Sequence, residues 1–121
     1  MKKILVIDDE PSIRVLLQKM LEREGHTAIT ASDGDEGMQL FEQTRFDLVI
    51  TDIIMPGKEG IEIIMEITKK YPDIPVIAIS GGGFNAPRSY LNIALAAGAA
   101  AVLEKPVEKD ILLSHVQKML A

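Results

Sequence analysis

The sequence predicts a single α/β domain in which a parallel sheet is covered by helices on both faces. Short, fully apolar runs alternate with stretches in which apolar residues recur at helical spacing, from one end of the chain to the other. Apolar runs without polar alternation are typical of strands that are buried on both faces. The chain has 121 residues, which is the size of one ordinary domain.

The first half of the chain contains two of these strand and helix units. We expect strands at 4–7 and 27–31 and helices at 11–24 and 33–44. Pro11 suits the first turn of its helix and Gly25 suits the end of the same helix. The residues expected to face inward from the two helices are Ile13, Leu16, Leu17, Met20, Leu21, Met38, Leu40 and Phe41.

The second half continues the alternation with three more units. Strands are expected at 47–52, 74–80 and 101–103, and helices at 59–70, in a segment ending at Gly98, and at 109–120. Pro75 fits the start of a strand, where a missing N–H is tolerated. The buried stripe of the 59–70 helix is expected to be Ile61, Ile64, Met65 and Ile67. Alternating strands and helices imply right-handed crossovers and a doubly wound sheet, for which we expect strand order 2-1-3-4-5.

Composition excludes several functional classes. The chain has no cysteine, so it has no thiolate nucleophile and no zinc-thiolate site. Its net charge is −5 and its 13 Lys and Arg are scattered, which argues against direct nucleic-acid binding. No apolar run approaches the roughly 18 residues of a membrane span, and the run at 4–7 is too short for a signal peptide. We therefore expect a cytoplasmic protein, without membrane insertion, that contacts other proteins or a divalent cation.

Polar side chains follow four of the predicted strands where those strands end. They are Asp8 and Asp9, Asp52, Ser80 and Lys105. Ligands of open α/β sheets bind outside the carboxyl ends of the strands, so these side chains are expected to converge. Carboxylates about 4 Å apart repel by a few kcal/mol, and a hard cation such as Mg²⁺ with oxygen ligands offsets this repulsion.

An aspartate in such a cluster can act as a nucleophile toward phosphorus and form an aspartyl-phosphate. Negative charge then gathers on the equatorial oxygens of the transition state. Mg²⁺, Lys105 and the Ser80 hydroxyl are the groups expected to stabilise that charge.

Five parts of the sequence resemble those of response-regulator receiver domains, and the resemblance covers essentially the whole chain. They are 4–10 (ILVIDDE), 47–57 (DLVITDIIMPG), Ser80, Gly98-Ala99 and Lys105-Pro106. The resemblance implies a flavodoxin-like, chemotaxis-regulator-like fold and a two-component phosphorelay function.

The resemblance also implies a role for each site residue. Asp52 would be the phosphoacceptor, and Mg²⁺ would be bound by Asp9, Asp52 and the backbone carbonyl of Ile54, with Asp8 acting through a water. Lys105 would pair with Asp52 at rest and with the phosphoryl oxygen after transfer, and the Lys105-Pro106 bond would be cis. The donor would be a phosphohistidine on a sensor histidine kinase or a histidine phosphotransfer protein.

Two features depart from the family pattern. Val102 stands where the family usually has Tyr or Phe, so the usual coupling between serine and aromatic residue is in doubt. The Gly81–Gly83 loop is about three residues longer than usual; it is either a flexible connection or room for the phosphoryl group.

Output and competing classes remain open. The chain is expected to have no output domain, to catalyse only its own phosphorylation and dephosphorylation, and to act on an unknown target, with dimerisation on phosphorylation an open alternative. Residues 91–102 are either a docking face or part of the core.

The competing functional classes are a degenerate receiver that only binds proteins, a phosphatase that forms an aspartyl-phosphate, and a flavodoxin-like electron carrier. Ile54 stands where the phosphatase needs a second aspartate, and Asp8-Asp9-Glu10 would repel a flavin phosphate.

Overall fold

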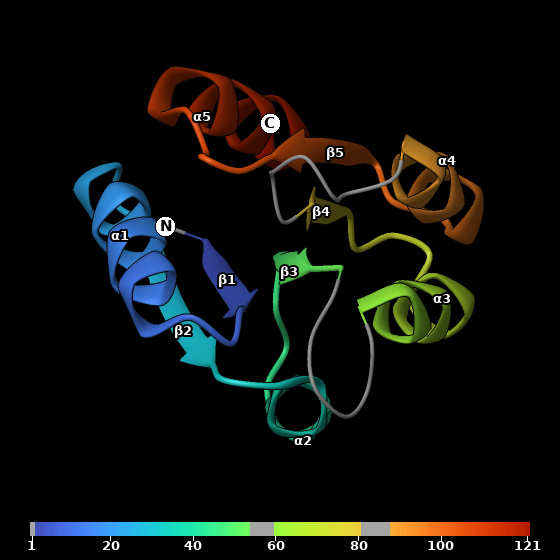
Figure 1. Ribbon diagram of the computed structural model, residues 1–121. Helices are drawn as coiled ribbons and strands as arrows, with labels where there is room; N and C mark the ends of the chain where they lie inside the picture. Colours follow the sequence, from blue (N-terminus) through green and yellow to red (C-terminus); the bar gives the residue numbers. More distant parts are fainter. Residues whose placement is uncertain (1, 54–59, 81–87) are drawn as a thin grey trace.

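A five-stranded parallel sheet with strand order β2-β1-β3-β4-β5 forms the centre of the molecule (Figure 1). The computed structural model describes residues 2–53, 60–80 and 88–121. The strands are β1 Lys3–Ile7, β2 Thr27–Ala31, β3 Leu48–Asp52, β4 Val76–Ser80 and β5 Ala101–Glu104. The helices are α1 Pro11–Arg23, α2 Gly34–Gln43, α3 Gly60–Lys70, α4 Arg88–Ala97 and α5 Lys109–Leu120. The predicted doubly wound fold and its strand order are therefore confirmed.

Each face of the sheet has its own hydrophobic core. Helices α1 and α5 cover one face, and α2, α3 and α4 cover the other (Figure 1). Successive residues of β1 point to opposite faces: Ile4 and Val6 pack with Leu17 of α1, whereas Leu5 and Ile7 pack with Phe41 of α2. This two-sided burial explains why the strands have no polar alternation.

Two predictions of buried residues are wrong. Leu16 and Met65 are exposed, and Ile63 is buried in place of Met65. In α3 the buried positions are 60, 63, 64 and 67, which follow a helical stripe that starts at Gly60. Met65 lies outside that stripe.

Gly60 allows α3 to start directly against the end of β3. Its N–H donates to the carbonyl oxygen of Ile53 at 3.0 Å. A Cβ atom at this position would overlap the backbone carbonyl oxygen of Asp52 and approach the Cα of Ile53 to 2.7 Å. The close approach of two backbones therefore requires glycine.

Gly98 ends α4 with a positive φ of 117°. A Cβ atom there would come within 2.5 Å of both Cγ2 and Oγ1 of Thr68 on α3. The same glycine thus reverses the chain toward β5 and lets α4 pack closely on α3. None of the described helices is long and apolar enough to cross a membrane.

Candidate functional site

The parallel register brings the ends of β1, β3, β4 and β5 to one edge of the sheet. Ile7 pairs with Thr51, Asp52 pairs with Ile79, and Ser80 pairs with Glu104. Each predicted site residue on these strands therefore lies at the carboxyl end of its strand or within two residues beyond it. This is the edge where open α/β sheets bind ligands.

Asp8 is fixed in a buried position between β1 and α1. Its N–H donates to the carbonyl oxygen of Ala31 at 3.1 Å, which extends the pairing with β2. The N–H of Glu10 donates to Asp8 Oδ1 at 2.9 Å, and Arg14 Nη1 donates to the Asp8 carbonyl oxygen at 2.6 Å. Asp8 is only 1% exposed, so its carboxylate is held in one orientation.

Asp52 and Ser80 are buried at the ends of the neighbouring interior strands β3 and β4, each 3% exposed. The Ile53 N–H donates to the carbonyl oxygen of Ile79 at 2.9 Å, so β3 and β4 stay paired up to the site. The Lys105 N–H donates to the carbonyl oxygen of Ser80 at 3.0 Å. Ser80 and Lys105 are therefore joined through their backbones.

Lys105 connects the carboxylates of this edge. Its Nζ lies 3.0 Å from Asp52 Oδ2, 3.0 Å from Asp8 Oδ2 and 3.2 Å from Glu10 Oε1. The contacts with Asp52 and Glu10 are hydrogen bonds, and the contact with Asp8 is an ion pair. The Lys105-Pro106 peptide bond is cis, as the sequence resemblance implied.

The ionisation of Lys105 follows from these neighbours. Burial lowers the pKa of Lys105, but its close contacts with the Asp8 and Asp52 carboxylates and their negative charges outweigh burial, and the pKa rises well above its usual value. Lys105 is therefore a permanent cation between two buried carboxylates at neutral pH.

The acidic cluster next to Lys105 suits a hard cation. One carboxylate oxygen from each of Asp8, Asp9 and Glu10 lies within 4.8 Å of the other two. The buried Asp8 Oδ2 accepts no hydrogen bond from the described residues, although Lys105 offsets its charge. An oxygen-only donor set with an unsatisfied buried oxygen fits Mg²⁺. The remaining predicted ligand, the carbonyl of Ile54, lies outside the described residues, as does the Gly81–Gly83 loop.

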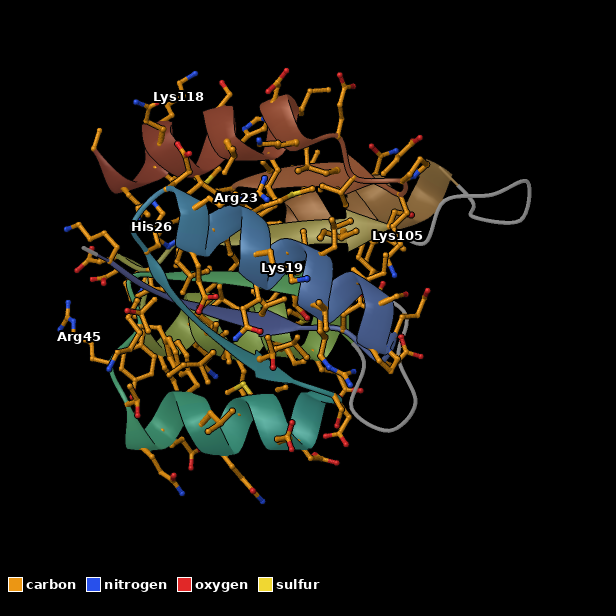
Figure 2. All side chains as sticks on the ribbon, turned by 90° about the vertical axis from the view of Figure 1, so that its left-hand side faces the viewer. Lys19, Arg23, His26, Arg45, Lys105 and Lys118 are labelled. Atoms are coloured by element: carbon orange, nitrogen blue, oxygen red, sulfur yellow. The ribbon has the colours of Figure 1, made fainter. Side chains whose placement is uncertain are left out.

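The structure thus brings Asp8, Asp52 and Lys105 into direct contact, with Asp9 beside Asp8 and Ser80 at the same edge. Two residues of this region were assigned no role from the sequence: Glu10, which bonds Lys105, and Arg14, which bonds the backbone of Asp8. The position of Glu10 immediately after the two aspartates was the available signal. His26 lies far from Lys105, toward the other end of α1 (Figure 2).

Comparison with known proteins gives the same assignment as the site. The sequence matches the family model described as the response regulator receiver domain over residues 4–117. Protein PilH of Pseudomonas aeruginosa is 33% identical, and the alignment covers 100% of this chain and 99% of that protein. The probable transcriptional regulator ycf27 of Guillardia theta is 37% identical, over 98% of this chain and 45% of that protein.

A solved structure shares the fold over nearly the whole chain. The response regulator protein TrrA of Thermotoga maritima, in complex with Mg²⁺ and BeF, superposes with a TM-score of 0.87 at 40% identity, covering 99% of this chain and 100% of that one. The chain spans only 17% to 45% of the length of the first curated relatives that it matches. The carboxylates in contact with Lys105 and the family match from residue 4 to residue 117 lead to the same conclusion. The chain belongs to the response regulator receiver domain family of two-component systems.

Proposed function

We propose that this receiver accepts a phosphoryl group on the Asp52 carboxylate in a Mg²⁺-dependent reaction and thereby changes its binding to partner proteins. One observation carries the proposal: a single lysine ammonium lies 3.0 Å from both Asp52 Oδ2 and Asp8 Oδ2, two buried carboxylates at the carboxyl edge of the sheet. A phosphoacceptor needs a carboxylate that is ionised and a fixed cation beside the incoming phosphoryl group. Asp52 offers the carboxylate, and Lys105 is the fixed cation beside it.

The chemistry proposed for the site is one displacement at phosphorus. An oxygen of Asp52 forms a bond to phosphorus while the bond from phosphorus to the donor nitrogen breaks, and the donor imidazole leaves with the electron pair and takes up a proton. Lys105 offsets the charge of one phosphoryl oxygen, and the Ser80 hydroxyl donates to another. Asp8, Asp9, Asp52 and the carbonyl of Ile54 are the proposed ligands of Mg²⁺, which would neutralise phosphoryl charge when bound.

The proposal extends to partners and location. The donor is a sensor histidine kinase or a histidine phosphotransfer protein, and the receiver catalyses only its own phosphorylation and dephosphorylation. We also propose a cytoplasmic location, consistent with the absence of cysteine from the chain. The alternative is a degenerate receiver that only binds proteins, but the contacts of Lys105 with Asp8 and Asp52 favour the active form.

The output mechanism departs from the family pattern at Val102. This side chain is half-buried and packs against the core that α3 and α4 share. A valine cannot rotate a phenol between inward and outward positions. We therefore propose that output depends on backbone and loop movement next to Ser80.

Intact mass spectrometry tests the phosphorylation. The protein is incubated with acetyl phosphate and Mg²⁺, beside Asp52→Asn and a control, Asp110→Asn, which removes the same charge from an exposed position in α5. A single phosphoryl adduct on the native protein and on the control, but not on Asp52→Asn, supports the proposal. If Mg²⁺ binds and no adduct forms, the degenerate binding module replaces it.

A further inference from the structure

Glu10 occupies the N-cap of α1 without using its side chain for capping. Its carbonyl oxygen accepts the N–H groups of Ile13 and Arg14, both at 3.1 Å, and Pro11 follows at the first helical position. Short polar side chains are preferred at N-caps because they can accept a helix N–H, and Glu10 makes no such bond. The backbone therefore starts this helix, and the carboxylate of Glu10 reaches across to Lys105.

Three carboxylate oxygens surround the Lys105 ammonium at 3.0 to 3.2 Å. Nζ donates hydrogen bonds to Asp52 and Glu10 and forms an ion pair with Asp8. A phosphoryl oxygen that approaches Lys105 therefore competes with these carboxylates for the ammonium.

Burial determines which carboxylate a phosphoryl oxygen can displace from Lys105. Asp8 is 1% exposed and is fixed through Oδ1 by the N–H of Glu10, and Asp52 carries the phosphoryl group itself. The Glu10 side chain is 57% exposed, so it can move into water at low cost. Glu10 is the only one of the three that can be exchanged without disturbing the site.

We propose that Glu10 is a positioning residue that holds the Lys105 ammonium at rest and gives up its place to the phosphoryl group. This inference rests on the proposed function, because it assigns Lys105 to a phosphoryl oxygen. The Glu10–Lys105 ion pair is present in the free state and broken in the phosphorylated state. Glu10 therefore opposes phosphorylation by the strength of one exposed ion pair.

The experiment measures binding of beryllofluoride, a phosphoryl analogue, by calorimetry at saturating Mg²⁺. Glu10→Gln should bind the analogue about twofold to fivefold more tightly than the native protein, because the exchange no longer breaks an ion pair. The matched control is Glu108→Gln, which removes the same charge from the N-cap of α5, where the side chain also makes no capping bond. This control should bind like the native protein.

A Lys105→Met background separates positioning from simple repulsion between Glu10 and the anion. If Glu10 acts through Lys105, Glu10→Gln should have little effect when Lys105 is absent. A gain that persists in Lys105→Met would overturn the proposal in favour of repulsion, as would unchanged or weaker binding by Glu10→Gln alone. Failure of the native protein to bind beryllofluoride would count against the proposed function instead.

The Glu10–Lys105 ion pair can also be tested in the absence of any ligand. In urea unfolding of the free protein without Mg²⁺, Glu10→Gln should be more destabilising with Lys105 present than in Lys105→Met. This second cycle applies even if Lys105→Met binds the analogue too weakly for calorimetry. Equal effects of Glu10→Gln in the two backgrounds would show that the ion pair contributes nothing at rest and would refute the inference.

Discussion

Replacing Lys105 by Met should destabilise the free protein mainly through the two buried carboxylates that remain. Lys105 Nζ lies 3.0 Å from Asp8 Oδ2 and from Asp52 Oδ2, and the lysine side chain is only 11% exposed. Methionine keeps most of the apolar stem, so the loss is one of charge more than of packing.

The expected magnitude follows from these distances and from burial. At an effective dielectric of about 20, charges about 4 Å apart attract by roughly 4 kcal/mol, and desolvation of the ammonium offsets much of this. Removing one partner of a fully buried pair costs about 3–5 kcal/mol. Because the exposed Asp9 and Glu10 show that this edge of the sheet is open to water, we expect a loss of about 2–3 kcal/mol.

Urea unfolding at pH 7 measures this loss, first with EDTA and then with Mg²⁺. The expected loss corresponds to a shift of about 1–2 M in the urea midpoint. Mg²⁺ should restore a large part of it, since a divalent cation bound by the folded state compensates the same carboxylates. Lys19→Met, on the exposed face of α1, is the control and should change stability by no more than about 0.5 kcal/mol (Figure 2). Equal losses for the two variants, or a loss that Mg²⁺ leaves unchanged, would refute the reasoning.

Further predictions concern the glycines, the lysine pKa and the missing aromatic residue. Gly60→Ala should lower stability by about 1–3 kcal/mol and reduce formation of the phosphoryl adduct, since its Cβ overlaps the backbone of β3; unfolding and intact mass check both. Gly98→Ala should cost about 1–3 kcal/mol in urea unfolding, and Thr68→Ala in the same chain should recover only the part due to the clash, not the part due to the positive φ. The pKa of Lys105 is raised on folding, so its contribution to stability is fully present below the unfolded pKa of about 10.4 and is lost only as pH rises through the folded value. The difference in unfolding free energy between native protein and Lys105→Met should therefore be constant from pH 7 to about pH 10. A decline over this range would contradict the prediction. Val102→Tyr should leave the NMR shift changes caused by beryllofluoride and Mg²⁺ unaltered, whereas a large gain in those changes would favour an aromatic switch.

The order and type of the helices and strands were predictable from the sequence because each carries its own periodicity. The strand Thr27–Ala31 and the helix Lys109–Leu120 have the expected bounds. Which face of α3 is buried was not predictable, because four of the five residues from Ile61 to Met65 are apolar and fit more than one stripe. The contact with the sheet selects Ile63 and Ile64 and leaves Met65 in solvent.

The core interpretation applies to part of the segment that contains α4, and the docking face stays a prediction. Ala94, Ala99 and Ala101 are buried, as expected for core, whereas Ile93 and Leu95 are exposed, as a docking face requires. The sequence alone could not separate these positions, because small and large apolar residues alternate along the segment. Ala94 is buried in the core that α3 and α4 share, whereas the large Ile93 and Leu95 are exposed, as are the small Ala96 and Ala100.

The charge balance of the site bears on which contacts of its buried and exposed carboxylates were predictable from the sequence. Four carboxylates, Asp8, Asp9, Glu10 and Asp52, gather around one lysine, and only Asp8 and Asp52 are buried. A buried carboxylate needs a partner, and the strand ends alone implied a divalent cation beside the clustered carboxylates. The family resemblance implied the pair of Lys105 with Asp52, whereas the contact of Lys105 with Asp8 was not predicted. Glu10 is exposed and needs no partner, so its bond to Lys105 depends on the direction in which α1 starts, which residue spacing does not reveal. One lysine cannot neutralise two buried carboxylates, and the Asp8 oxygen without a hydrogen bond from the described residues marks where the remaining negative charge lies. The same imbalance that limits stability without metal is therefore what suits this edge of the sheet to a divalent cation.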